Sequence, residues 1–210
     1  MNKLILIPIL VVVAIIISAL TLMTNNESSE PESKLIYDAG FTYYDMEKIQ
    51  YTLVKQNIIV SFPTAITDHT INQYCTYFEK GLPRTVEYCT TTAILDIEGN
   101  PLGNINMGGD TSSPVLAIAN LETSSLESNS VEVFAIFETM IESLVCECWE
   151  DEKSEDYATI AAWVDGVQNF YIDSDKRDIK SKIDDLAGYE IFLEITSKDD
   201  SILQTLIILK

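Results

Sequence analysis

The feature that most constrains this chain is an apolar segment at its N-terminus. From Leu4 to Met23 there are 20 residues without a charge, interrupted only by one proline and two hydroxyl residues. A helix of that length spans about 30 Å, which is the hydrocarbon thickness of a bilayer. Secretory signal peptides have a shorter apolar core and a small-residue cleavage site, which the exit sequence ALTLMTNN lacks. The segment predicts a transmembrane signal-anchor helix over residues 1–24, with a cleaved signal peptide as the alternative.

The charges on either side of this segment predict its orientation. The α-amino group and Lys3 are positive on one side, whereas the other side has no basic residue before Lys34. Positive charge tends to remain cytoplasmic. We therefore expect a single-pass protein of the cell membrane, with its N-terminus in the cytoplasm and residues 25–210 outside.

The remainder of the chain divides into a linker and one domain. Residues 25–34 are polar, contain a proline and lack apolar periodicity, which indicates a flexible spacer. Residues 35–210 are enough for one ordinary domain, expected to be extracytoplasmic. Without Lys3, 12 basic residues face 33 acidic ones, a formal charge of −21. This charge disfavours nucleic acid and anionic lipid as partners and favours cations or a basic protein surface, unless it is simply a solvated acidic surface.

Residue periodicity predicts the elements of the first half of the domain. A short apolar run closed by proline, residues 57–63, indicates a buried strand. Residues 84–110 are rich in β-branched side chains around a Glu-Gly-Asn-Pro turn and predict a β-hairpin. Residues 111–129 fit a helix or a strand. A helix ending at Gly81 is predicted from apolar residues at i, i+3, i+4 and i+7, namely Ile71, Tyr74, Cys75 and Phe78.

The second half carries the strongest helical pattern. Residues 157–172 fit a helix better than a hairpin turning at Asp165-Gly166. Two strands, Tyr189–Ile195 and Ile202–Leu209, end the chain, and the last is apolar enough to be central. Together these elements predict an α+β domain with a mostly antiparallel sheet packed against helices. A continuous stripe within residues 127–149 is formed by Val133, Phe134, Phe137, Met140, Ile141, Leu144, Val145 and Cys148. A short helix stopped by Gly188 is predicted from inward-facing Ile179, Ile183 and Leu186.

Four cysteines, Cys75, Cys89, Cys146 and Cys148, are the residues with the most chemical potential. Outside the cell an even number suggests disulfides. One arrangement pairs Cys75 with Cys89 and Cys146 with Cys148, and another ties both residues of the CxC pair back to Cys75 and Cys89. Closing the loop between Cys75 and Cys89 stabilises a fold by about 3 kcal/mol in the chain-entropy model. Free thiols in a cytosolic domain, or a weak metal site for zinc or Cu(I) at Cys146 and Cys148, are the alternatives.

Few residues are suited to catalysis. His69 is the sole histidine, and its place beside Asp68 at a helix start fits a surface cap. The glycines and hydroxyls of residues 107–114 lack the lysine and spacing of a phosphate loop and indicate a turn. We expect no enzyme and no cofactor. Two acidic clusters lack the glycine and terminal glutamate of a calcium loop and are read as solvated charge: Asp173, Asp175 and Asp178, and Glu150, Asp151, Glu152, Glu155 and Asp156.

These observations favour a membrane-anchored, non-enzymatic domain that binds a small ligand or another surface protein. The alternative from a different class is a thiol-based redox or metal-handling protein that uses Cys146 and Cys148. A hydrolase acting on envelope polymers is a third possibility. The identity of the ligand or partner and the oligomeric state are not encoded in any motif of the chain.

Overall fold

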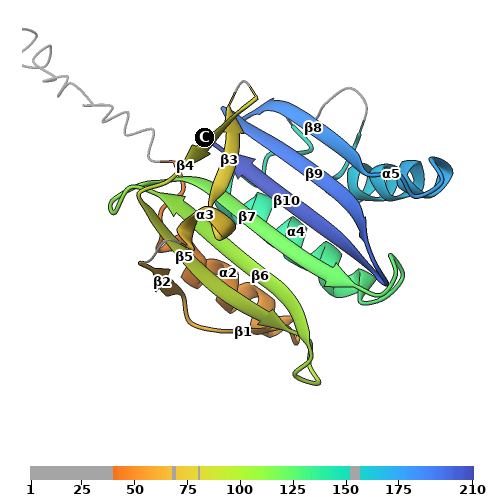
Figure 1. The fold of residues 1–210 in the computed structure, drawn as a ribbon, viewed down its shortest axis with the longest axis horizontal. Helices are drawn as coiled ribbons and strands as arrows, with labels where there is room; N and C mark the ends of the chain where they lie inside the picture. The colour runs from red at the N-terminus through yellow and green to blue at the C-terminus, as the bar shows by residue number, and fades with distance from the viewer. Residues whose placement is uncertain (1–39, 68–69, 80, 152–156) are drawn as a thin grey trace, which may run out of the picture. The chain divides into compact units, whose positions relative to one another are not determined.

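The computed structural model describes residues 40–67, 70–79, 81–151 and 157–210 (Figure 1). In this part of the chain no helix is both long and apolar enough to cross a membrane. The predicted anchor and linker, residues 1–34, lie outside it. The elements in chain order are α2 (Asp45–Lys55), β1 (Ile59–Val60), β2 (Thr64–Ile66), α3 (Ile71–Tyr74), β3 (Thr76–Glu79), β4 (Leu82–Thr85), β5 (Tyr88–Leu95), β6 (Pro101–Gly109), β7 (Pro114–Thr123), α4 (Ser130–Leu144), α5 (Ile160–Asp173), β8 (Ile179–Leu186), β9 (Tyr189–Lys198) and β10 (Ser201–Leu209).

An antiparallel sheet forms the centre of the domain. Its strands follow the order β1-β5-β6-β7-β10-β9-β8, and β2 also pairs with β5. Two meanders, β5-β6-β7 and β8-β9-β10, meet where β7 pairs with β10 along eight residue pairs. Helices α2 and α3 and four short strands precede the first meander, whereas α4 and α5 lie between the two meanders. The predicted α+β class with a mostly antiparallel sheet is confirmed, as is the central position of the last strand.

Three helices cover one face of this sheet with the main hydrophobic core. Figure 1 shows α4 behind the sheet, while α3 and the β3–β4 hairpin lie on the opposite face. The Trp163 indole N–H donates to Ser181 Oγ at 2.9 Å, which ties α5 to β8. The buried helical side chains are Met46, Ile49 and Leu53 of α2, Val133, Ala135, Ile136, Phe137, Thr139, Met140, Ile141 and Leu144 of α4, and Ile160, Trp163, Val164, Val167 and Tyr171 of α5.

The two helices of the second half follow the predicted period closely. In α4, five members of the predicted stripe are fully or almost fully buried, from Val133 to Leu144. The helix ends there, so Cys148 lies beyond it and not on its stripe. The helix interpretation of residues 157–172 holds for α5, although Phe170 is 64% exposed and not part of its inner face.

Two helix predictions are wrong, and each error has a structural reason. Only one helical turn, α3, forms in the first predicted segment, because the backbone leaves helical geometry at Cys75 and the β-prone run after it becomes β3. The segment 179–186 is strand β8. Ile179 and Ile183 share one face of a strand as readily as one of a helix, and a register shift between Ile183 and Leu186 returns Leu186 to that face.

Three further sequence interpretations are settled by the strands. Residues 114–123, which fitted a helix or a strand, form β7. The predicted hairpin is confirmed as β5–β6, but the face that Cys89 shares with Ala93 points away from the helices, and Ala93 is exposed. The strand predicted near residue 59 exists as β1, but it is not buried. Ile59 is 44% exposed because β1 is a two-residue edge strand.

Candidate functional site

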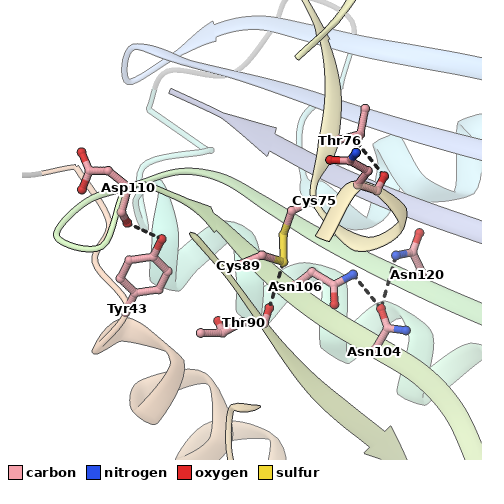
Figure 2. Close-up of a disulfide and its surroundings, with 10 residues drawn as sticks. Tyr43, Cys75, Thr76, Cys89, Thr90, Asn104, Asn106, Asp110 and Asn120 are labelled. Atoms are coloured by element: carbon pink, nitrogen blue, oxygen red, sulfur yellow. Dashed lines mark hydrogen bonds between the residues drawn. A yellow bond between two sulfur atoms is a disulfide. The ribbon is translucent and has the colours of Figure 1, made fainter. Parts of the chain in front are cut away.

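The second face of the sheet is partly covered by α3 and the β3–β4 hairpin, which a disulfide fastens to β5. Cys75, at the end of α3, is bonded to Cys89 on β5, with 6.1 Å between their Cα atoms (Figure 2). Both cysteines are fully buried. A smaller apolar cluster surrounds them, with Val86, Leu116 and Ile118 as its other buried members. The bond therefore joins the hairpin to the sheet within a buried apolar cluster.

A glycine makes room for this bond. Gly108 of β6 lies opposite Cys89 in the ladder. A Cβ atom at position 108 would lie 2.9 Å from Cys75 Sγ and 2.9 Å from a methyl group of Val86. Real Cβ contacts are essentially never that short, so a side chain here would push α3 off the sheet. The close approach of α3 to the sheet explains the glycine at this position.

The hairpin is held at both ends and, between them, by Tyr77 of β3, which is half-buried against the same apolar cluster. After β4, Val86 is buried and the backbone N–H of Glu87 donates to the carbonyl of Gly109 at 2.9 Å. Between these attachments every residue of β4 is exposed, and the Phe78 ring of β3 is 65% exposed. Isolated two-stranded hairpins are marginally stable in water. The disulfide, Val86 and Tyr77 therefore determine the position of this hairpin on the sheet.

A trough of about 300 Å³ lies between the hairpin and the sheet. Its floor comes from β7 and β10, one wall from α3 and β3, and the opposite wall from β9 and β8. A neighbouring hollow of about 620 Å³ shares four of its lining residues and extends the trough toward the end of β10. The lining residues of the trough are Gln73, Tyr74, Thr76, Tyr77, Phe78, Ile118, Asn120, Lys180, Phe192, Glu194, Thr205, Ile207 and Leu209.

A row of amides crosses the second face of the sheet and reaches the floor of the trough at Asn120. Asn106 and Asn120 each donate to the side-chain carbonyl of Asn104, at 2.9 and 3.3 Å (Figure 2). Thr205 donates in turn to Asn120 Oδ1 at 3.2 Å. Asn106 is fully buried, and its Oδ1 atom has no hydrogen-bond partner within the described part of the chain. The floor thus offers fixed polar groups beside the apolar Ile118 and Ile207.

The charges around the trough are paired. Lys180 forms an ion pair with Glu194, and its ammonium lies 4.4 Å from the centre of the Phe192 ring. Farther along, Lys182 bonds to Glu190 at 2.6 Å. Hydrogen bonds to Asp184 and then to Glu190 raise the pKa of Lys182 above its ordinary value. The lysines are therefore neutralised by neighbouring carboxylates, and the arrangement suits a ligand without a strong negative charge.

Another cleft, of about 580 Å³, lies near the start of α2. Tyr43 and Tyr88 pack edge to face there, with 5.2 Å between ring centroids, and the Tyr43 hydroxyl donates to the carbonyl of Asp110 at 2.8 Å. Burial, followed by the proximity of Tyr88 and Asp110, raises the pKa of Tyr43 to about 12. Because these tyrosine groups are already engaged with one another, the trough is the stronger candidate for a ligand site.

The predicted cysteine site proves to be a local bridge. Cys146 is bonded to Cys148 just beyond α4, so two disulfides occur, in the first of the two arrangements predicted. Both residues are half-buried, and Glu147 between them lies 3.9 Å from Lys48 of α2. No free cysteine remains. Among the described residues no group of three or more histidine, cysteine or acidic side chains is placed to hold a metal ion.

The other residues singled out in the sequence are not brought together. His69 lies outside the described residues, as do Glu152, Glu155 and Asp156. The segment 107–114 contains the predicted turn, in which Asp110 Oδ1 accepts hydrogen bonds from Ser112 and from the backbone N–H of Ser113. The first of these bonds, from the Ser112 hydroxyl, is the main cause that lowers the pKa of Asp110.

The trough itself was missed by the sequence interpretation, although a signal exists. Asn104 and Asn106 alternate with apolar residues in NINM, and Phe192 alternates with the core residues around it in EIFLE. That alternation marks side chains on the second face of a sheet. The sequence does not predict the β3–β4 hairpin, because the spacing of Tyr74, Cys75 and Phe78 fits a helix up to Gly81.

Comparisons of this chain with protein-family models, with curated proteins and with solved structures found no match.

The two disulfides should differ in their contribution to stability. We expect Cys75→Ala combined with Cys89→Ala to lower the free energy of unfolding by about 3 kcal/mol, because the bond closes a loop of about 15 residues. The Cys146–Cys148 bond closes a far shorter loop. Cys146→Ala combined with Cys148→Ala should therefore lower the free energy of unfolding by about half as much. Urea unfolding of the full chain in detergent measures both. Equal losses for the two pairs would show that loop length does not govern their effects.

Proposed function

We propose that this protein is a single-pass membrane-anchored receptor-like binding domain, displayed outside the cytoplasm, which holds its ligand or protein partner in the trough. The apolar segment before residue 25 and the charge of −21 after it motivate the location. The paired cysteines are consistent with an oxidising compartment. No catalytic role is proposed for any side chain of the domain.

The observation that carries this proposal is the construction of the trough. Its wall is a hairpin fastened over the sheet by a buried disulfide, and this wall leaves Asn120, Thr205 and the apolar floor open to a ligand. Binding sites are typically concave, largely apolar and equipped with a few fixed polar groups. Asn120 and Thr205 supply such groups between Ile118 and Ile207.

A second candidate function, thiol–disulfide exchange, is favoured by the Cys146–Cys148 bond. The bond joins residues two apart, fastens no two elements together and is reachable by solvent. Exposed bonds of this kind are the labile ones. A thiolate of an external dithiol would attack one sulfur and release the other as a thiolate. The second thiol of the donor would then complete a two-electron transfer that leaves two protein thiols and an oxidised dithiol.

Site-specific crosslinking in intact cells tests the binding proposal. A benzophenone-bearing residue is placed at Phe78, beside the trough, or at Phe170 on α5, whose exposed fraction is almost the same, 65% against 64%. On illumination we expect a discrete adduct, formed from outside the membrane, at position 78 and none at position 170. Adducts at both positions in equal amount, or at neither, would contradict a ligand in the trough.

Titration with a dithiol buffer, followed by alkylation and mass spectrometry, tests the redox candidate. A redox role requires Cys146 and Cys148 to open while Cys75 and Cys89 stay bonded. If all four cysteines resist reduction until the chain unfolds, both bonds are structural and the redox candidate is wrong.

A further inference from the structure

The β3 strand has a free hydrogen-bonding edge that faces the trough. Within the described part of the chain β3 pairs only with β4. In Figure 1, β4 lies on one side of β3, and the strands of the opposite wall, β9 and β8, lie on the other. The backbone groups of β3 that do not point to β4 therefore point across the trough.

The ladder register identifies Phe78 as the main residue at this edge. A two-residue connection joins Glu79 to Leu82, and the pair that closes such a hairpin exchanges both backbone hydrogen bonds. Because bonded and non-bonded pairs alternate, the next pair, Phe78 with Pro83, is non-bonded. Pro83 has no N–H to give, which fits this position. The N–H and C=O of Phe78 are consequently directed away from β4.

The outer edges of the central sheet are protected, unlike the edge of β3. On β8, Lys180 and Lys182 and the register shift before Leu186 discourage pairing with another strand. At the other edge, β1 and β2 are two and three residues long and are separated by a segment containing Pro63. Short strands, lysines, irregularities and proline are the usual means of blocking an edge. β3 is also short, with four residues, but it contains no lysine, no proline and no register shift.

The shape and charge of the trough fit an extended polypeptide. A strand laid beside β3 would point every second side chain toward the apolar floor of Ile118, Ile207 and Leu209. The adjoining hollow, which shares Tyr77 and Phe192, continues along the same line and lengthens the site. The lysines and glutamates in the walls of the trough are paired with one another, but the formal charge of −21 after the apolar segment attracts partners that carry basic residues.

We infer that the trough binds an extended segment of a partner protein, apolar at alternate positions and flanked by lysine or arginine, which adds as a strand to the free edge of β3. Backbone hydrogen bonds with Phe78 give the affinity, and the floor selects the side chains. This inference rests on the proposed function, because it names the class of partner for the same trough.

A pair of substitutions at one position tests the strand addition. Phe78→Pro removes the outward N–H and leaves the bonds between β3 and β4 intact, whereas Phe78→Ala removes only the ring and is the matched control. The probe is a phage library of random peptides, selected on the full chain in detergent micelles. We expect enriched peptides with alternating apolar residues and basic ends. These should bind the Phe78→Pro variant about tenfold more weakly than the Phe78→Ala variant, because one backbone hydrogen bond is lost.

Other outcomes overturn the inference in distinguishable ways. Enriched peptides that bind both variants equally do not use the edge. If the selection enriches no alternating peptide while crosslinking at Phe78 still captures an adduct, the trough binds a ligand, but the ligand is not an extended polypeptide. Concentration-dependent dimers that are lost in Phe78→Pro but not in Phe78→Ala would identify a second copy of this chain as the occupant. If neither peptide binding nor crosslinking is found, the trough is not a binding site.

Discussion

The Cys75–Cys89 bond is the constraint on which the second face of this domain depends. Helices α2, α4 and α5 hold the first face through a large apolar core, but the β3–β4 hairpin has only a small cluster beneath it. A hairpin of four residues per strand does not stand alone in water. The bond fixes its base against β5 and β6, and Gly108 permits the required distance. Without this attachment the sheet would be open and the trough would lose a wall.

The sheet contributes the rigid half of the same site. The pairing of β7 with β10 joins the two meanders and places Asn120 opposite Thr205 in the middle of the sheet. Side chains of one parity from these strands face the helices, and those of the other parity form the floor of the trough. One face of the sheet therefore packs against the helices of the core, and the other forms the floor of the trough. The trough combines this stable floor with a wall of lower local stability.

The sequence was informative where a single period ran over many residues. It predicted α4, the hairpin β5–β6 and the final strands, because burial on one face imposes a pattern there. It failed at α3 and β8, where a few apolar residues fitted both periods, and a register shift at Ile183 imitated helical spacing. The pairing of Cys75 with Cys89 followed from chain proximity, as one of two arrangements. The trough did not follow, because it depends on which face of the sheet a hairpin covers.

Amide hydrogen exchange of the full chain in detergent tests most directly whether the disulfide holds the wall of the trough. The comparison is between the native chain and the variant with both Cys75 and Cys89 replaced by alanine. We expect residues 76–85 to lose most of their protection in the variant, while the amides of β10 keep theirs, because local opening does not involve the central sheet. Protection of residues 76–85 that is the same in both proteins would contradict it, since the hairpin would then be held by something other than the bond.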